Sequence, residues 1–344
     1  MKRHRLAFVG LGRVADVHYA SLLAMPDRTQ LVAVCDTRPE AVAQRQTEWN
    51  VPGFADFEQL LQSVEVDAVC LFLPHHVHRE FVATAVAHRK PIFLEKPIAT
   101  TVEEAEAITR LCADGRVMLM VAHNGLFHPA FEQMAAFVGN GWLGRPLFAR
   151  GTSAWWLTFR PWDFRLSREQ TGGGCWIDAG GHLVYCLREL LGDVADVTGY
   201  TAKLARPEME GEDHAAATMK YRSGALAHLF VSYGHKMPNY QHDWPLGYLN
   251  SIEVHGDRGS IEYVICPEPR LRYFSEVPEA MPPGFQGWLT HTPAEPYTSS
   301  FRYELAHFLD CLETGQRPRV TGEDATAVLR VLRALYESEA KRGS

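Results

Sequence analysis

No run of apolar residues in this sequence reaches the roughly 18 residues that a membrane-spanning helix needs. A basic stripe is also missing, because the formal net charge is −7 and no cluster of lysine and arginine interleaves with aromatic residues. These absences argue against a membrane protein and against nucleic-acid binding. The apolar stretch Leu6–Val9, which follows a basic start, is too short for a signal peptide. We therefore expect a cytoplasmic protein.

Cysteine pairs are missing as well. The seven cysteines are odd in number, scattered along the chain and never form a C-x-x-C motif. Most of them fall within apolar patterns, where a thiol is typical of a small buried hydrophobic side chain. The sequence therefore predicts no disulfides, no structural zinc site and no bound metal ion.

The 344 residues are too many for one ordinary hydrophobic core and fit two domains. In the first third, short and nearly continuous apolar runs alternate with helical patterns, which is typical of parallel strands buried on both faces. The runs are Leu6–Val9, Leu31–Cys35, Ala68–Leu73, Ile92–Leu94 and Val117–Val121. Asp56 and Thr101, each followed three residues later by Gln or Glu, predict helix starts. The alternation predicts a doubly wound α/β domain over residues 1–122.

After about residue 122 the pattern changes to a second domain, over residues 123–344. A helix near 129–138 and a strand over 146–156 precede a glycine-punctuated helix over 175–191. Strand-like runs follow at 197–204, 215–221, 225–233, 251–255, 260–265 and 271–274. Strands clustered in sequence predict an antiparallel or mixed sheet and an α+β domain. Two helices close the chain after a proline-rich excursion at 266–299.

A glycine turn follows the first predicted strand directly and opens a helix, as Gly10-Leu11-Gly12-Arg13-Val14-Ala15. Gly10 permits the tight turn, Gly12 lets the backbone approach a pyrophosphate, and Ala15 keeps strand and helix close. Asp36 ends the second strand, at the distance where a carboxylate accepts hydrogen bonds from an adenosine ribose. The combination predicts a dinucleotide site, and the alternative is a purely structural turn.

The choice of dinucleotide depends on Asp36 and Arg38. The Asp36 carboxylate would repel a 2′-phosphate, which favours NAD, while Arg38 is close enough to bind that phosphate, so NADP stays possible. The residues expected to contact the cofactor are Gly10, Gly12, Arg13, Val14, Asp36, Thr37, Arg38, Leu73, Pro74, His75, His78, Glu95, Lys96 and Asn124. A metal site at His75, His76 and His78 is the alternative for that loop, but no acidic or cysteine partner is evident.

Lys96 follows the predicted strand Ile92–Leu94, between Glu95 and Pro97. Ligands bind at the carboxyl ends of strands in doubly wound sheets. Lys96 could therefore stabilise negative charge that develops on a substrate oxygen. The alternative is a solvated lysine at the edge of a loop.

Asp178 and His182 follow a triple glycine, Gly172–Gly174, and project from one face if residues 175–191 are helical. Gly180 and Gly181 each cost about 1 kcal/mol in a helix interior, which suggests close approach by a ligand or another backbone. Histidine is a suitable base for oxidising an alcohol, and Asp178 could orient it or hold a substrate hydroxyl. The alternative is a helix-start acid and a packed histidine.

Two further segments are candidates for the substrate pocket. Residues 155–165 are rich in aromatics and could form a sugar-stacking wall, with Trp156, Arg160 and Arg165 near substrate or cofactor. The alternative is a hydrophobic anchor for a long loop. Tyr233-Gly234-His235 and Tyr240-Gln241-His242 flank a loop, from which His235 and Tyr240 are candidates to contact substrate hydroxyls. The alternative there is an ordinary surface loop.

Taken together, these motifs resemble the glucose-fructose oxidoreductase / inositol dehydrogenase / rhizopine catabolism (Gfo/Idh/MocA) family almost end to end. The most specific match is Gly172–Gly174 with Asp178-x-Gly180-x-His182. The other matches are Gly10-x-Gly12-x-x-Ala15, Cys35-Asp36, Leu73-Pro74-x-x-x-His78, Glu95-Lys96-Pro97, Asn124-x-x-Phe127-x-Pro129, Gly141-x-x-Gly144-x-Pro146, Gly256-x-x-Gly259 and Gly322-Glu323-Asp324-Ala325. Two positions depart from the family pattern, Leu126 in place of an arginine and Tyr185 in place of an acid, and both could alter substrate fit.

The resemblance implies a Rossmann domain followed by a domain with a large open, mostly antiparallel sheet that often mediates oligomerisation. We therefore expect a homodimer or homotetramer. It also implies that Lys96, Asp178 and His182 carry the family's catalytic roles. The expected activity is hydride transfer between NAD(P) and a carbinol of a sugar, sugar derivative or cyclitol. The alternatives are an NAD-dependent glycoside hydrolase that oxidises its substrate transiently, and a non-catalytic NAD- or ligand-sensing protein.

Overall fold

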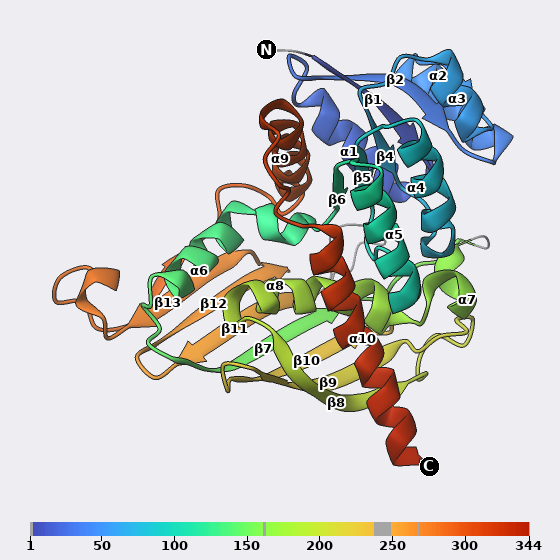
Figure 1. Cartoon of the computed structure of the whole chain (residues 1–344). Coiled ribbons are helices and arrows are strands. Elements are labelled where there is room, and N and C mark those ends of the chain that lie inside the picture. Colours follow the sequence, from blue (N-terminus) through green and yellow to red (C-terminus); the bar gives the residue numbers. More distant parts are fainter. Residues whose placement is uncertain (1–2, 161–162, 237–248, 267, 344) are drawn as a thin grey trace. The chain divides into compact units, whose positions relative to one another are not determined.

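The computed structural model describes residues 3–160, 163–236, 249–266 and 268–343 of the chain (Figure 1). The chain forms two compact units. One comprises the chain up to Asn124 together with Thr298–Leu329, and the other comprises Gly125–Tyr297 together with the chain from Arg330 onward. The predicted boundaries, 1–122 and 123–344, did not include this return of residues 298–329 to the first unit. An amphipathic pattern predicts a helix with an apolar face but does not say which core that face covers.

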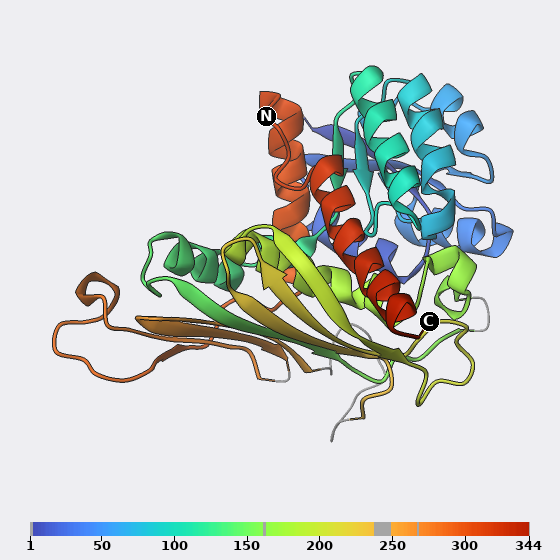
Figure 2. The ribbon, with the colours of Figure 1, turned by 60° about the horizontal axis from the view of Figure 1, so that its bottom comes forward.

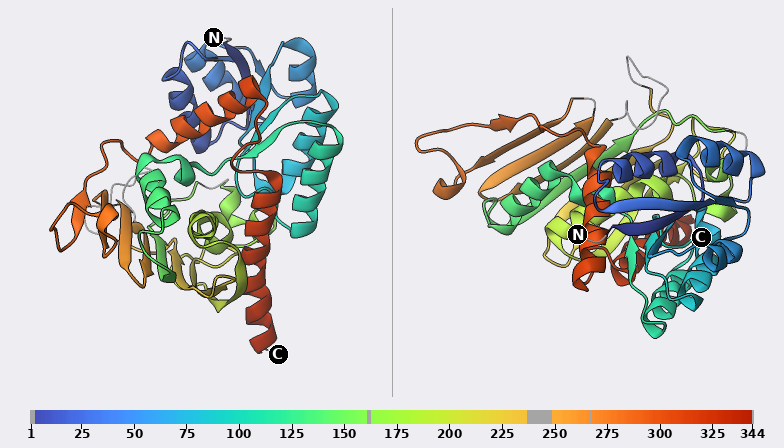
Figure 3. Two further views of the ribbon diagram at one scale, coloured as in Figure 1. Left: turned by 60° about the vertical axis from the view of Figure 1, so that its left-hand side comes forward. Right: turned by 90° about the horizontal axis from the view of Figure 1, so that it is seen from above.

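The first unit contains a six-stranded parallel sheet in the order β3-β2-β1-β4-β5-β6, with helices on both faces (Figure 3). This is the strand order of a doubly wound dinucleotide-binding fold, as predicted. The strands are β1 (His4–Val9), β2 (Thr29–Cys35), β3 (Gly53–Phe54), β4 (Ala68–Leu71), β5 (Ile92–Leu94) and β6 (Leu119–Val121). The helices are α1 (Arg13–Leu23), α2 (Pro39–Trp49), α3 (Phe57–Ser63), α4 (His78–Ala87), α5 (Val102–Asp114), α9 (Ser299–Thr314) and the first turns of α10 (Gly322–Gly343).

The apolar runs in the sequence form strands because both of their faces are covered. Every residue of β4, β5 and β6 is buried. The two predicted helix starts are also confirmed, since the side chain of Asp56 accepts a hydrogen bond from the Gln59 N–H, and that of Thr101 from the Glu104 N–H. Local sequence signals therefore account for most of this unit.

The second unit is built on an eight-stranded sheet in the order β14-β13-β12-β11-β7-β10-β9-β8. Only the β7–β10 pair is parallel, so the predicted mostly antiparallel sheet is confirmed. The strands are β7 (Pro146–Ala154), β8 (Val194–Ala202), β9 (His214–Tyr221), β10 (Leu226–Ser232), β11 (Leu249–Gly256), β12 (Gly259–Cys266), β13 (Arg270–Ser275) and β14 (Leu289–His291). The proline-rich excursion contains β14 and a short 3₁₀ turn at Pro278–Ala280.

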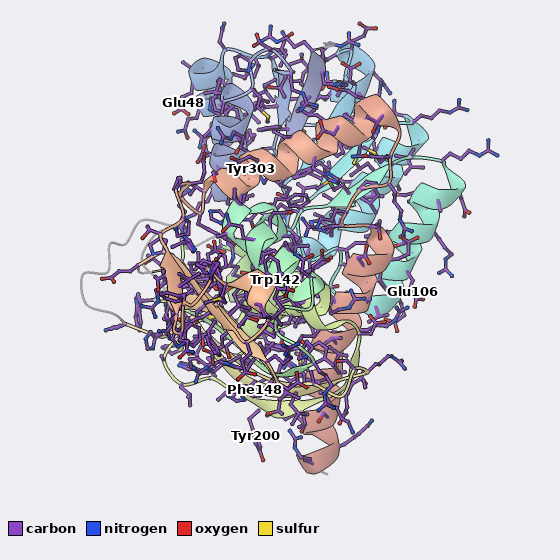
Figure 4. All side chains as sticks on the ribbon, turned by 90° about the vertical axis from the view of Figure 1, so that its left-hand side faces the viewer. Glu48, Glu106, Trp142, Phe148, Tyr200 and Tyr303 are labelled. Carbon is purple, nitrogen blue, oxygen red and sulfur yellow. The ribbon has the colours of Figure 1, made fainter. Side chains whose placement is uncertain are left out.

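Helices α6 (Pro129–Gly139) and α8 (Gly181–Leu191) cover one face of this sheet (Figure 2). Strand residues alternate accordingly, for example buried Ala149 and Gly151 with exposed Phe148 and Arg150. Phe148, labelled in Figure 4, lies opposite Leu226 of the neighbouring strand, and the two side chains are 39% and 47% exposed. In the described ranges, none of the helices has the length and apolar character required to span a bilayer.

A buried polar cluster lies at the carboxyl ends of β5 and β6, inside the first unit. Glu304 of α9 is fully buried and accepts a hydrogen bond from the His123 N–H. His18 donates from Nε2 to Oε1 of Glu95 over 3.1 Å. Burial would raise the pKa of Glu95, but the hydrogen bond from His18 and the charges of His18 and Lys96 lower it overall. Burial raises the pKa of Glu304, and the negative charge of Glu95 raises it further.

We predict that replacing Glu304 by glutamine flattens the pH dependence of stability. Because the folded-state pKa of Glu304 is raised, its contribution is fully present below the unfolded-state pKa and is lost as the pH rises towards the folded-state pKa. Glutamine keeps the acceptor for the His123 N–H and cannot ionise. As the pH rises from about 6, which is above the unfolded-state pKa of a glutamate, the wild-type melting temperature should therefore fall more than that of Glu304→Gln.

Glu313→Gln, on the same helix, is the control. The hydrogen bond from Arg28 lowers the pKa of Glu313, so this group is ionised throughout that pH range in both states. Its replacement should leave the slope of melting temperature against pH unchanged. Equal slopes for wild type and Glu304→Gln would contradict the prediction.

Candidate active site

The glycine turn between β1 and α1 has the geometry that the sequence predicts. Gly10 adopts φ +90°, and a Cβ there would overlap the carbonyl oxygen of Phe72. At Gly12, a Cβ would have no described atom within 4 Å apart from those of Gly12 itself and its neighbours along the chain. Packing inside the protein therefore does not require glycine at position 12. Helix α1 begins at Arg13 with no side-chain cap at Gly12, so its first N–H groups suit an anionic ligand.

Asp36, at the end of β2, joins this turn to the adjacent loop. Its Oδ2 accepts from the Leu11 N–H over 2.8 Å. Arg38 donates through Nε to Oδ1 and through Nη2 to Oδ2, each over 3.0 Å. Burial alone would raise the pKa of Asp36, but the hydrogen bonds from Arg38 and Leu11 lower it overall. The carboxylate is thus ionised and bidentately paired.

Residues 73–78 and the end of β5 line the same edge of the sheet. The ring of His78 is fully buried between the carbonyl oxygens of Leu73 and Ile98, at 3.0 and 3.1 Å. Burial lowers the pKa of His78, and the neutral ring has a single N–H, so it donates to one of these two carbonyl oxygens at a time. The ring is thus enclosed between two loops, and its predicted cofactor contact stays a prediction. No three His, Cys, Asp or Glu side chains in the described ranges come together as metal ligands.

Lys96 is half-buried in the loop after β5, before a cis peptide bond to Pro97. Its backbone N–H donates to Oε2 of Glu95 over 3.0 Å. Asn124, another predicted cofactor residue, is buried and donates from Nδ2 to the Ser300 hydroxyl over 2.8 Å. Lys96 belongs to the first unit, whereas Asp178 and His182 belong to the second.

The triple glycine of the second unit passes against the backbone of Glu212. A Cβ at Gly174 would overlap the carbonyl oxygen of Glu212, and one at Gly173 would overlap the hydroxyl of Tyr336. Oε1 of buried Glu212 accepts from the N–H groups of Gly174 and Trp176, at 3.1 and 3.0 Å, and from the Tyr336 hydroxyl at 2.8 Å. These glycines are therefore required by close packing.

The predicted helix over 175–191 begins with one π-helical turn, Trp176–Gly180, which leads into α8. Such single turns are frequent at functional sites. A Cβ at Gly180 would lie 2.6 Å from the ring of Trp176, whose Nε1 donates to the Leu332 carbonyl oxygen. A Cβ at Gly181 would lie 3.7 Å from the side chain of Leu332, which is an ordinary van der Waals contact. Close approach therefore explains Gly180 but not Gly181.

Asp178 lies on the π-helical turn and is only 5% exposed. Its Oδ2 accepts from Nε of Arg165 over 2.8 Å and from the hydroxyl of Tyr233 over 2.5 Å. Arg165, which was predicted near substrate or cofactor, pairs with Asp178 and Asp163. In the tripeptide 233–235, sequence reasoning selected His235, whereas the side chain that reaches Asp178 is Tyr233. His182, at the start of α8, is half-buried.

The remaining pocket candidates differ in position. The ring of Trp156 contacts the guanidinium of Arg206 and the ammonium of Lys236, at 4.5 and 4.4 Å from its centroid. This chain's own cations therefore contact a ring that was predicted to stack on a sugar. Arg160 is exposed and His235 is half-exposed, while Tyr240 lies outside the described residues.

Comparisons with protein families give two matches. The model of an oxidoreductase family with an NAD-binding Rossmann fold matches residues 4–123. A model of a GFO/IDH/MocA C-terminal domain matches residues 131–262. Together they cover both sheets except the final strands.

Relatives with curated names span nearly the whole chain. The scyllo-inositol 2-dehydrogenase (NAD(+)) of Bacillus subtilis (strain 168) is 27% identical over 348 residues, which cover 95% of this chain and 91% of that protein. The D-xylose 1-dehydrogenase (NADP(+)) 2 of Haloferax volcanii is 26% identical over 325 residues, covering 94% of this chain and 90% of that protein.

Solved structures agree in fold. An oxidoreductase from Agrobacterium radiobacter in complex with NAD+, L-tartaric acid and magnesium has a TM-score of 0.84 at 23% identity, covering 99% of this chain and 97% of that chain. The aldose-aldose oxidoreductase of Caulobacter crescentus, complexed with glycerol, has a TM-score of 0.84 at 23% identity, covering 100% and 99%. These similarities establish the fold.

We predict that Gly174→Ala destabilises the protein and that Gly181→Ala does not. The added methyl group at position 174 would overlap the Glu212 carbonyl oxygen, so the free energy of unfolding should fall by about 2 kcal/mol or more. At position 181 alanine meets ordinary contact in a helix, which should be neutral or stabilising by up to about 1 kcal/mol. Urea unfolding followed by circular dichroism measures both, and equal stabilities of the two variants would refute the packing account.

Proposed function

Because the chain belongs to the Gfo/Idh/MocA oxidoreductase family, as its motifs predicted, we propose that it is an NAD(P)-dependent dehydrogenase of a sugar, sugar derivative or cyclitol. The observation that carries this proposal is the match of both family models, one over each sheet-bearing part of the chain. Curated relatives are named for scyllo-inositol, myo-inositol, D-xylose and D-apiose, which are all polyhydroxylated compounds. Oxidation or reduction at one carbinol is the chemistry these names share.

The residues of the first unit fit a nicotinamide dinucleotide. The tight turn at Gly10, the open position at Gly12 and the uncapped start of α1 suit a pyrophosphate. An acid at the end of the second strand binds the adenosine ribose in this fold, and we propose this role for Asp36. We propose a preference for NAD, since the ionised Asp36 repels a 2′-phosphate. Arg38 pairs with Asp36 and lowers that repulsion, which leaves measurable affinity for NADP.

We assign the catalytic roles to Lys96, Asp178 and His182. A bound NAD(P) would supply the nicotinamide ring as acceptor or donor of the carbinol hydride. During oxidation His182 accepts the proton of the substrate hydroxyl. The ammonium group of Lys96 stabilises negative charge that develops on that oxygen. Asp178 provides a fixed negative acceptor for His182 or for a second substrate hydroxyl, and reduction reverses these steps.

We also propose that residues 1–122 bind the cofactor, that the remainder binds substrate, and that the protein forms a homodimer or homotetramer in the cytoplasm. The open face of the eight-stranded sheet supports association, because Phe148 and Leu226 form an exposed apolar pair there. Ion pairs such as Arg150–Glu253 on the same face would contribute specificity.

We predict that the protein reduces NAD with at least one compound from a panel of inositols, aldoses, glycosides and uronates. Lys96→Ala should lower kcat by about a hundredfold or more, because a charge-stabilising donor is lost at the reacting oxygen. The dissociation constant for NAD, measured by fluorescence titration, should stay within about twofold of the wild-type value. Absorbance of NADH at saturating substrate measures kcat.

Lys90→Ala is the matched control, since Lys90 precedes β5 and donates to the Val66 carbonyl oxygen. It should leave kcat unchanged. Full turnover by Lys96→Ala would remove Lys96 from the mechanism. Release of a free sugar from a glycoside without net NADH would instead indicate a transient-oxidation hydrolase.

We predict that Asp36→Asn shifts cofactor preference towards NADP. Asparagine keeps an acceptor for the Leu11 N–H, removes the negative charge and releases Arg38 from its ion pair. The ratio of the NADP to the NAD dissociation constant should fall about tenfold or more, which corresponds to removal of one close charge repulsion. Arg38→Ala should raise that ratio. An unchanged ratio in both variants would contradict this account of selectivity.

A further inference from the structure

We propose that Arg165 and Tyr233 are positioning residues, which hold the carboxylate of Asp178 in one orientation as a hydrogen-bond acceptor of the site. This inference rests on the proposed dehydrogenase function. It gives Arg165 a role besides the predicted position near substrate or cofactor, and it gives Tyr233 a role that the sequence did not indicate.

The two donors converge on one oxygen atom. Nε of Arg165 lies 2.8 Å from Oδ2 of Asp178, and the hydroxyl of Tyr233 lies 2.5 Å from the same atom. Asp178 itself is almost fully buried, so the carboxylate depends on protein donors rather than bulk water for stabilisation. Charge-assisted hydrogen bonds of this kind are about twice as strong as neutral ones. The carboxylate is therefore restrained in rotation.

Tyr233 is held in place along its backbone. Its N–H donates to the Asp213 carbonyl oxygen over 2.9 Å, and its own carbonyl oxygen accepts from Nη1 of Arg206 over 3.1 Å. The preceding residue, Ser232, is fixed by a hydrogen bond between its hydroxyl and Nε2 of His214 at 3.0 Å. The phenol ring packs against Trp155 and Phe159. These contacts set the position of the hydroxyl before any ligand binds.

Arg165 is restrained in a similar way by its own neighbours. Its Nη1 pairs with Oδ1 of Asp163 over 3.1 Å, and its guanidinium lies 4.7 Å from the ring centroid of Phe164. Burial alone would lower the pKa of Arg165, but the charges of Asp178 and Asp163 raise it overall. Burial raises the pKa of Tyr233, and the charge of Asp178 raises it further. Both groups therefore remain donors.

A fixed carboxylate suits the proposed mechanism. In that mechanism the proton of the substrate hydroxyl passes to the imidazole of His182, and Asp178 is the acceptor for His182 or for a second substrate hydroxyl. An acceptor that two protein donors already hold in place does not have to be reoriented in each turnover.

The test compares two buried tyrosines of the second unit, Tyr233 just after β10 and Tyr221 in β9. Tyr233→Phe removes the hydroxyl that reaches Asp178, whereas Tyr221→Phe removes one that contacts only the Met219 sulfur among the described residues. Tyr233→Phe should lower kcat about tenfold to hundredfold, which is the range for one hydrogen bond to a charged group. Tyr221→Phe should leave kcat unchanged, and both should bind NAD like the wild type.

A double-mutant cycle separates positioning from a general effect on folding. If Tyr233 acts through Asp178, then Tyr233→Phe should change kcat by less than about twofold in an Asp178→Asn background. Arg165→Lys should retain more turnover than Arg165→Met, because the charge is kept. Arg188→Met, which breaks the Arg188–Asp193 pair of the same unit, is the control for loss of an arginine.

The same cycle is also measured on unfolding midpoints, which do not require activity. If the stability loss of the double variant differs from the sum of the losses for Tyr233→Phe and Asp178→Asn, the hydrogen bond between the two residues is supported. Additive losses overturn the proposal. Independent, multiplicative losses of kcat in the two variants overturn it as well. The dehydrogenase function fails on a different result, namely wild-type protein that produces no NADH from any polyol in the panel.

Discussion

The hydrogen bonds to the buried carboxylate of Glu212 are the constraint on which the second unit's chemistry depends. One oxygen accepts from two backbone N–H groups of the segment 174–176 and from the hydroxyl of Tyr336. Burial raises the pKa of Glu212, so the surrounding donors have to offset a costly desolvation. The backbone of Gly174 packs directly against Glu212, which fixes the start of the π-helical turn that follows. The positions of Asp178 and His182 therefore depend on this packing.

Much of the architecture could be predicted from the sequence because it is encoded locally. The apolar runs at β1, β4 and β5, the glycine at position 10 and the caps at Asp56 and Thr101 each act over a few residues. The family could be identified because the motif around Asp178 and His182 has a fixed spacing. The return of α9 and part of α10 to the first unit could not be predicted, since residues nearly two hundred positions apart in sequence meet there, as in the Asn124–Ser300 hydrogen bond.

Side-chain partners were the least predictable part of the site. The sequence analysis placed Arg165 near substrate or cofactor, but it did not show that Asp178 and Asp163 pair with this side chain. It placed Trp156 in a sugar-stacking wall, but it did not show that Arg206 and Lys236 contact the ring. Such contacts join residues that come together only in the folded chain, so local sequence signals do not contain them. Close packing by the protein itself explains Gly180 but leaves room for a Cβ at Gly181.

Helix α10 contributes residues to both units, and this has a consequence for synthesis on the ribosome. Leu332, Arg333 and Tyr336 bond to Trp176, Gly172 and Glu212, about 120 to 160 positions earlier in the chain. A nascent chain that has already formed its strands still lacks the residues that secure its π-helical turn. The turn that carries Asp178 therefore lacks these contacts until α10 has emerged from the exit tunnel.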